Sequence, residues 1–306
     1  MLRNGLYGLG AADMKGALAA MVYGAKALLD SGIQLPGDLY VVGVVQEEPC
    51  EGLAMRVLVE EEGIKSDYVV LGEATNLQIA RGQRGRIELK VTTLGSAAHA
   101  SAPERGENAI YSAAKVIVGL ELLAPQLGED PFLGKGTVAV TQIESSASSR
   151  NAIPEICRLY IDRRLTSGET AAKAVAEVKR VIARERVRAQ VEVTQYSADS
   201  YTGYHCQAEQ YSPPWTLPQD APLVRRCVAV IEDVLGFIGG EVHRFTIGRW
   251  AFSTDGVYTA GIPTIGFGPG EERFAHAANE QVRLQDVAAA AEVYANLPLA
   301  ILSRRS

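Results

Sequence analysis

The sequence contains few cysteines and no long apolar run. Its four cysteines, Cys50, Cys157, Cys206 and Cys227, form no CxxC pair and follow no regular spacing. That pattern argues against a disulfide framework and fits reduced thiols in a cytoplasmic protein. No stretch approaches the roughly 20 consecutive apolar residues that a membrane span needs, and the first residues contain no apolar signal segment. The sequence therefore predicts a cytoplasmic protein with no membrane partner.

Basic residues are also in the minority. The 306 residues include 36 acidic and 30 basic side chains, which gives a formal net charge of -6 and leaves no basic stripe. We therefore expect no nucleic acid partner. Hydrophobic residues make up 47% of the chain, enough for a sizeable core. A chain of this length tends to split into two domains.

The first part of the chain has the pattern of an α/β protein. Apolar residues recur at helical spacing from Leu18 to Leu29, which predicts an amphipathic helix. The nearly continuous, β-branched run 39–45 predicts a strand buried on both faces, and the run 68–71 is similar. Because an apolar helical segment at 53–62 separates these two runs, we predict a mostly parallel sheet.

The pattern changes at Gly85, where apolar and polar residues begin to alternate. The order β-α-β-β-α-β that follows is typical of a ferredoxin-like module with two helices on one face of its sheet. After Tyr201 the chain returns to α/β patterning. We predict one domain formed by residues 1–84 and 199–306, with an inserted module at 85–198. Inside the module we expect strands at 87–93, 137–143, 156–165 and 191–195, and helices at 108–123 and 169–186.

Polar side chains follow the predicted strands of the first domain. Asp13 follows a Gly-rich turn, Glu47 and Glu48 follow the run ending at Val45, Glu73 follows the run ending at Leu71, and His276 follows a late strand and a GPG loop. Ligands gather at the carboxyl ends of such strands, and four carboxylates with one imidazole suit zinc. Each cluster alone is more often a solvated charge or a helix cap. Their common position favours a metal site.

Several longer runs resemble one known family. The chain is similar to the co-catalytic zinc hydrolases that include aminoacylase, acetylornithine deacetylase, succinyl-diaminopimelate desuccinylase and glutamate carboxypeptidase, and it is closest in texture to their selenium-metabolism hydrolases. The resemblance covers nearly the whole chain, in the family's order. It is carried by YGLGAADMKGALAA at 7–20, VVQEEPCEG at 44–52, GEAT at 72–75, GSAAHASAPERGENAI at 95–110, NAIP at 151–154, DRRLTSGE at 162–169, STDGV at 253–257 and GIPTIGFGPGEERFAHAANE at 261–280.

The resemblance implies a role for each residue of the polar cluster. Asp13 would bridge two zinc ions, and Glu47 would be the general base acting on the bridging water. Glu48 and His276 would complete one metal site, and Glu73 would serve the other. Two such metals lower the pKa of their water and polarise the scissile carbonyl. The donor set also suits Mn²⁺ or Co²⁺.

One expected feature of the family is absent from the sequence. The family's second metal takes a histidine from a His-x-Asp motif upstream of the GAADMKG-like turn, and that position falls before Met1. The chain's histidines are His99, His205, His243 and His276, and none is followed two residues later by Asp. We therefore expect a catalytic domain truncated at its N-terminus, with one zinc ion where the family has two.

The resemblance also assigns residues of the inserted module. His99 would reach across a homodimer into the partner's active site and stabilise the oxyanion, although a lone histidine is about as often structural. Asn151 and Arg164 would contact the substrate carboxylate, which a guanidinium binds bidentately. The backbone near Gly268 would add N–H donors.

The sequence therefore predicts a homodimeric metallohydrolase that cleaves an amide bond in a small N-acyl amino acid or short peptide. The alternative is a truncated or degenerate binding protein that keeps the fold and the dimer without catalysis. The missing His-x-Asp motif is the feature that distinguishes the two.

Overall fold

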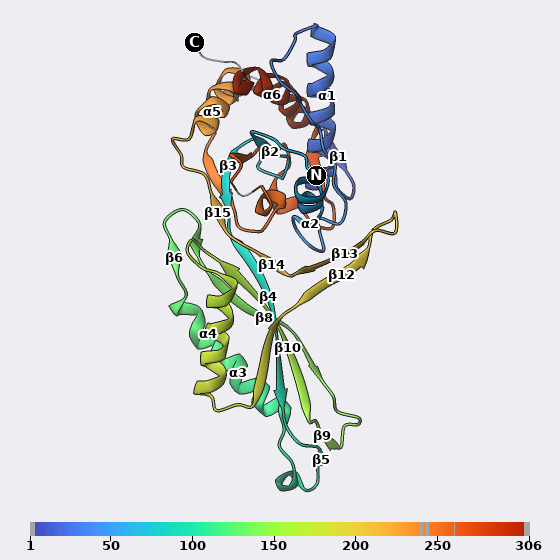
Figure 1. The fold of residues 1–306 in the computed structure, drawn as a ribbon, viewed down its shortest axis with the longest axis vertical. Helices are drawn as coiled ribbons and strands as arrows, with labels where there is room; N and C mark the ends of the chain where they lie inside the picture. The colour runs from blue at the N-terminus through green and yellow to red at the C-terminus, as the bar shows by residue number, and fades with distance from the viewer. Residues whose placement is uncertain (1–3, 239–240, 243–244, 260, 303–306) are drawn as a thin grey trace.

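The computed structural model describes residues 4–238, 241–242, 245–259 and 261–302. Figure 1 shows two layered regions joined by long strands, one containing both ends of the described chain and the other formed by the middle of the sequence. The helices are α1 (Gly16–Ser31), α2 (Leu53–Arg56), α3 (Ala109–Leu123), α4 (Ala171–Arg184), α5 (Pro222–Leu235) and α6 (Leu284–Leu302).

Local signals in the sequence explain where these helices begin and end. The Asn108 side chain accepts a hydrogen bond from the amide of Ile110, and the Thr170 side chain accepts one from Lys173, so both residues cap helix N-termini. α1 ends at Gly32, which has φ of 71° and closes the helix in the left-handed conformation. α5 begins with Pro222, and proline is well tolerated there because N–H groups of the first helical turn have no partner within the helix.

The sheet of the first region is mixed. Its order is β15 (Trp215–Thr216), β3 (Ile79–Gln83), β19 (Thr264–Gly266) and β2 (Val69–Leu71), and β18 (Ile247–Trp250) also pairs with β3. The pairs β18–β3 and β19–β2 are parallel, whereas β15–β3 and β19–β3 are antiparallel. The sheet is therefore mixed: its longer pairings, β18–β3 and β19–β2, are parallel as predicted, and the short antiparallel pairings are the part that the sequence did not predict. Helices α1, α5 and α6 pack with this sheet around one apolar core.

The predicted strand at 39–45 is absent. The chain there is irregular, and its apolar side chains are exposed, with Tyr40 61% exposed and Leu39 43% exposed. β2 is the last strand in the order of its sheet, and no strand in the described part of the chain pairs with its free edge. A strand buried in a sheet needs backbone hydrogen bonds to a neighbouring strand. No strand in the described part of the chain pairs with 39–45, so its sequence pattern alone does not make it a strand.

The middle of the chain forms an antiparallel sheet in the predicted β-α-β-β-α-β order. Strands β4 (Gly85–Leu94), β8 (Thr137–Ser145), β10 (Ile156–Leu165) and β11 (Ala189–Val193) lie in the spatial order β11-β4-β10-β8. Every second residue of β4 and β10 is buried, as the alternating pattern predicts, because successive side chains point to opposite faces. The buried faces pack against α3 and α4 in a second core.

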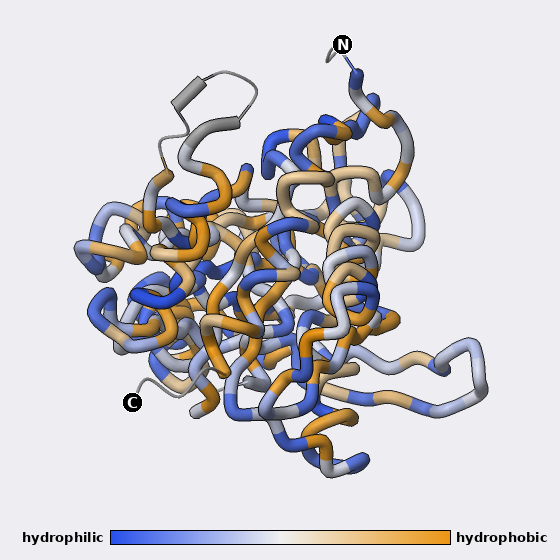
Figure 2. The backbone as a smooth tube through the Cα atoms, turned by 90° about the horizontal axis from the view of Figure 1, so that it is seen from above, coloured by the Kyte–Doolittle hydropathy of each residue, from blue (hydrophilic) through white to orange (hydrophobic). Residues whose placement is uncertain are grey.

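Two chain segments connect the sheets. β3 runs almost directly into β4, with Arg84 between them, and β14 (Tyr211–Ser212) pairs with β4 just before β15 pairs with β3. Between them the hairpin β12 (Gln195–Asp199) and β13 (His205–Glu209) projects from the molecule (Figures 1 and 2). The boundary drawn at residue 198 falls within β12.

Further short strand pairs are β1 (Gly5–Tyr7) with β20 (Gln281–Arg283), β5 (Ala98–His99) with β9 (Ala152–Ile153), β6 (Glu129–Asp130) with β7 (Gly134–Lys135), and β16 (Phe237–Ile238) with β17 (Glu241–Val242).

Within the described residues, none of the helices combines the length and the apolar character needed to span a bilayer.

Candidate metal centre

Asp13 lies in an irregular turn that precedes α1. The turn opens at Gly10, which has φ of 81°, a conformation that glycine adopts without strain. Asp13 itself has non-helical angles of φ -131° and ψ 91° within the segment Ala11–Lys15. Backbone amides of the turn donate to the buried carboxylate of Glu280, which therefore holds the turn in place.

Glu47 and Glu48 lie on a loop between the irregular segment 39–45 and α2. The preceding Gln46 has φ of 60°, an uncommon conformation for a residue with a side chain. At the other end of the loop, the amide of Gly52 donates a 3.0 Å hydrogen bond to Oδ1 of Asp255. The loop therefore depends on contacts from elsewhere in the chain rather than on a strand of its own.

His276 approaches from the loop that follows β19. A Cβ added to Gly270 in this loop would lie 2.4 Å from the carbonyl oxygen of Ala12, so only glycine permits this close approach to the Asp13 turn. His276 has φ of 54°. Sparsely populated backbone conformations of this kind gather at functional sites, where the surroundings hold them.

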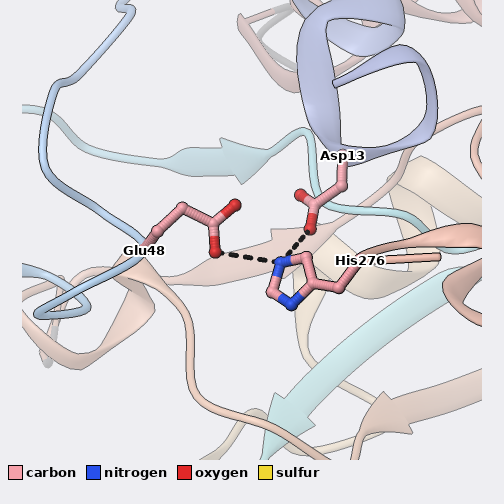
Figure 3. Close-up of side chains that lie close together, drawn as sticks. All are labelled: Asp13, Glu48 and His276. Atoms are coloured by element: carbon pink, nitrogen blue, oxygen red, sulfur yellow. Dashed lines mark ion pairs between the residues drawn. The ribbon is translucent and has the colours of Figure 1, made fainter. Parts of the chain in front are cut away.

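These three segments bring Asp13, Glu48 and His276 together, as Figure 3 shows. His276 Nε2 lies 2.9 Å from Glu48 Oε2 and 3.3 Å from Asp13 Oδ2. One ligand atom from each residue can be chosen so that all three lie within 4.8 Å of one another. Two carboxylates and an imidazole at this separation form a donor set that suits zinc and similar divalent ions.

Further carboxylates lie behind this trio with strongly raised pKa values. Burial, followed by the charges of Glu73 and Asp255, raises the pKa of Glu47 to about 10. Burial and the charge of Asp13 raise the pKa of Glu73 to about 8, and burial raises that of Asp255 to about 6. Burial and the charge of Glu48 also raise the pKa of Asp13. Clustered buried acids that repel one another fit a site for a multivalent cation, which would favour their charged forms.

The carboxylates also line a cavity of about 270 Å³. Asp13, Glu47, Glu48, Glu73 and Asp255 contribute its polar walls, and apolar side chains of α1, α2 and β2 contribute much of the remainder. A volume of this order is at the lower end of the range for small-molecule sites, where a few polar groups converge in an apolar cleft.

Four other residues that the sequence indicated are not members of the trio. The guanidinium of Arg164 donates two hydrogen bonds to the carboxylate of Asp162, from Nε to Oδ1 at 2.7 Å and from Nη2 to Oδ2 at 3.1 Å. The amide of Gly268 donates to the hydroxyl of Thr75 at 2.9 Å. His99 and Asn151 are exposed on or beside the short β5–β9 pair, at the end of the insert farthest from the first region (Figure 1).

Sequence reasoning missed two acids of the site, the half-buried Asp255 and the buried Glu280. Asp255 holds the loop that carries Glu47 and Glu48, and Glu280 holds the turn that carries Asp13. Both fall inside runs that were singled out by the resemblance, STDGV at 253–257 and the end of the run at 261–280. Their position in those runs was the available signal, but only the fold reveals which backbone amides they accept.

Comparison with known proteins gives a family match over almost the whole chain. The model of a family described as peptidase family M20/M25/M40 matches residues 2–300. The uncharacterized protein YgeY of Escherichia coli (strain K12) is 40% identical over 299 residues, which are 97% of this chain and 73% of that protein. Acetylornithine deacetylase of Proteus mirabilis (strain HI4320) is 28% identical over 287 residues, covering 90% of this chain and 66% of the enzyme.

A solved structure supports the same fold. Aminopeptidase PepT from Bacillus cereus ATCC 10987 superposes with a TM-score of 0.72 over 99% of this chain and 76% of its own, at 19% sequence identity. At that identity the likeness concerns the fold alone.

Proposed function

Because this chain belongs to peptidase family M20/M25/M40, we propose that it hydrolyses an amide bond in a small N-acyl amino acid or short peptide with the help of a bound divalent metal. The family's hydrolases act on amide and peptide bonds. The choice of a small acylated or peptidic substrate is our proposal for this chain.

The observation that carries the proposal is the convergence of Asp13, Glu48 and His276. They come from three segments far apart in the sequence, and the cavity lined by Asp13 and Glu48 also contains Glu47 and Glu73, whose pKa values are raised. A solvated surface pair would not be expected to lie beside a buried acid such as Glu73, which is 7% exposed and whose pKa is raised by burial and by the charge of Asp13.

We assign Asp13, Glu48, Glu73 and His276 as metal ligands. Asp13 is the candidate to bridge two ions, since it faces His276 and its charge raises the pKa of Glu73. Zn²⁺ is the expected ion, with Mn²⁺ or Co²⁺ as alternatives. The described residues contain a single cluster of three or more metal-binding side chains, and we therefore expect about one tightly bound ion per subunit.

Glu47 is the proposed general base. When bound, a zinc ion polarises the scissile carbonyl and lowers the pKa of a nearby water. The Glu47 carboxylate takes the proton from the attacking water and passes it to the leaving amine. The apolar cavity walls limit access of bulk solvent to this proton transfer, which strengthens the electrostatic interactions within it.

The remaining assignments depend on a homodimer. β5, which contains His99, and β9, which Asn151 precedes, lie at the end of the insert farthest from the first region (Figure 1), so these two residues can serve a metal centre only if it belongs to a second copy. We propose that the insert, residues 85–198, mediates a two-fold dimer in which His99 stabilises the oxyanion and Asn151 contacts the substrate. Arg164 and Gly268 are the proposed substrate contacts nearer to the metal centre, and binding would require Arg164 to exchange Asp162 for a substrate carboxylate.

Metal analysis tests this proposal directly. Protein loaded with Zn²⁺, dialysed against metal-free buffer and measured by mass spectrometry should retain about one equivalent per subunit. Loaded protein should also release free amino acid from a panel of N-acetyl and N-succinyl amino acids and dipeptides. Retention of no metal would contradict the metal centre, whereas tight metal without turnover on any panel member would favour a binding protein of the same fold.

A further inference from the structure

Glu280 is a buried acid beside the proposed metal centre, and none of the roles assigned above uses it. It is 5% exposed and lies between the loop carrying His276 and strand β20. Its Oε2 accepts a 2.8 Å hydrogen bond from the amide of Gly10, and its Oε1 accepts bonds of 2.9 Å from the amides of Ala12 and Asp13. Both carboxylate oxygens are therefore occupied by backbone N–H groups.

The turn that Glu280 holds has little support from regular structure. Asp13 lies outside helical φ/ψ space, so the usual helical ladder does not fix the peptide that carries its side chain. A single residue supplies the missing acceptors for three amides, and bonds from N–H groups to a carboxylate are about twice as strong as neutral ones. The carbonyl of Glu280 also accepts a 3.0 Å bond from the amide of Gly8.

The same residue connects two ligand-bearing segments. His276 lies four positions before Glu280, and β20, which follows Glu280, pairs with β1 just before the Asp13 turn. Any shift of the Glu280 carboxylate would therefore move the Asp13 turn relative to the loop of His276. The separation of Asp13 Oδ2 and His276 Nε2 is 3.3 Å, and metal ligands tolerate only small departures from their bonding distances.

We propose that Glu280 is a positioning residue that sets the location of Asp13 relative to His276 and so tunes the metal affinity of the site, without binding the metal itself. The inference rests on the proposed metal centre. Residues that orient metal ligands typically change metal affinity by roughly 10- to 100-fold when they are replaced.

The informative substitution is Glu280→Gln, which keeps the shape of the side chain. Its amide group places an N–H₂ donor against one of the backbone N–H donors, so at least one of the three bonds is lost. The matched control is Asp286→Asn. Asp286 is also 5% exposed and lies near Glu280 in the sequence, but it accepts a 2.8 Å bond from the Arg283 side chain and has no bond to the Asp13 turn.

Two measurements on the full chain test the positioning role of Glu280. In a titration with Co²⁺ followed by the visible absorption of the bound ion, Glu280→Gln should weaken binding roughly 10- to 100-fold, and Asp286→Asn should leave it near the parent value. In hydrogen exchange followed by mass spectrometry on metal-free protein, peptides covering residues 8–15 should exchange faster in Glu280→Gln alone.

The proposal is overturned if Glu280→Gln binds Co²⁺ like the parent, if Asp286→Asn weakens binding equally, or if exchange over residues 8–15 is unchanged. A parent protein that takes up no Co²⁺ would instead contradict the proposed metal centre. The exchange experiment would then still test whether Glu280 holds the turn.

A double substitution tests whether the effect passes through Asp13. If Glu280 acts on the metal only by positioning Asp13, adding Glu280→Gln to an Asp13→Asn chain should cause little further loss of Co²⁺ affinity, because coupled residues are not additive. Full additivity of the two losses would refute the positioning role.

Discussion

Glu47 and Glu48 are neighbours in the sequence, yet their carboxylates have different surroundings. Glu48 is 58% exposed and pairs with His276. Glu47 is surrounded by other acids, and burial with their charges raises its pKa to about 10. Adjacent residues on an irregular loop can differ in this way because no regular repeat constrains their directions. Their environments support different roles, ligand for Glu48 and proton carrier for Glu47.

Substitution of the two residues should separate these roles. Glu47→Gln should keep metal binding while lowering turnover by roughly 10²- to 10⁴-fold, the usual cost of losing a general base. Glu48→Gln should weaken metal binding itself, because an anionic ligand is lost. The checks are kcat on an active substrate and retained zinc after dialysis. Glu62→Gln, at an exposed acid that follows α2 in the sequence, is the control, and equal behaviour of all three variants would contradict both roles.

The raised pKa values also predict how the stability of metal-free protein depends on pH. Glu47 and Glu73 have ordinary values of 4.5 and values of about 10 and about 8 in the folded chain. Between these limits the folded state holds more protons than the unfolded state. The free energy of unfolding should therefore fall as pH rises from about 4.5 towards 8 to 10.

Urea unfolding at pH 5, 7 and 9 in the presence of a chelator measures this dependence. Glu47→Gln should flatten the slope, since glutamine does not titrate. The same slope in parent and variant would show that Glu47 does not carry the effect. Addition of Zn²⁺ to the parent at pH 7 should release protons, which a weakly buffered indicator dye detects.

At the scale of elements, the insert contains a buried charge cluster between β10 and α4. Arg163 is 2% exposed, and its Nη2 lies 2.7 Å from Glu169 Oε1 and 3.2 Å from Glu177 Oε2. Removal of one member of such a buried set leaves the opposite charges without compensation, which is costly even where the intact set contributes little.

Arg163→Ala should therefore lower the free energy of unfolding by about 3–5 kcal/mol. The comparison is Lys90→Ala, which removes the partly exposed pair of Lys90 with Glu192 and should cost at most about 1 kcal/mol. Urea denaturation at neutral pH measures both changes. A loss for Arg163→Ala no larger than that for Lys90→Ala would show that the cluster is not energetically important.

The segment 39–45 shows the limit of local patterning. Its sequence favours a buried strand, yet most of its side chains are exposed, and no strand of the described chain pairs with it. Backbone amides without ladder partners exchange rapidly with solvent. Amides at 39–45 should therefore exchange far faster than those of β10, which pairs on both sides with β4 and β8. Protection equal to that of β10 would mean that the segment has found a strand partner.

At the scale of the whole molecule, the separation of His99 from the metal centre is the main constraint. Mixed dimers of a His99→Ala chain and a Glu47→Gln chain contain one composite site with both residues intact. Activity should therefore reappear when the two inactive proteins exchange subunits, to about a quarter of the parent level if mixing is random and each composite site works independently.

Light scattering at micromolar concentration provides the control, because the assignment requires a dimer. A monomer would remove the basis for a role of His99 in trans. Mixed dimers that form and stay inactive would refute the assignment of His99 and leave the metal ligands unaffected.

The sequence by itself determined the family and most of the elements. The insert could be predicted from the alternation of apolar and polar residues. β4 and β10 each pair with strands on both sides and have helices on one face only, so every second side chain is buried. The candidate ligands Asp13, Glu48 and His276 followed from their motifs, and the fold brings them together.

Tertiary structure decided the features that depend on groups distant in the sequence. The run 39–45 is largely exposed and pairs with no strand of the described chain. The presence or absence of a pairing strand cannot be read from a local sequence pattern. Glu280 and Asp255 act through backbone amides about 270 and 200 positions away, Gly10 and Gly52. The pKa values of Glu47 and Glu73 arise from burial and from the charges of acids on other segments. Burial and through-space charge exist only once the chain has folded.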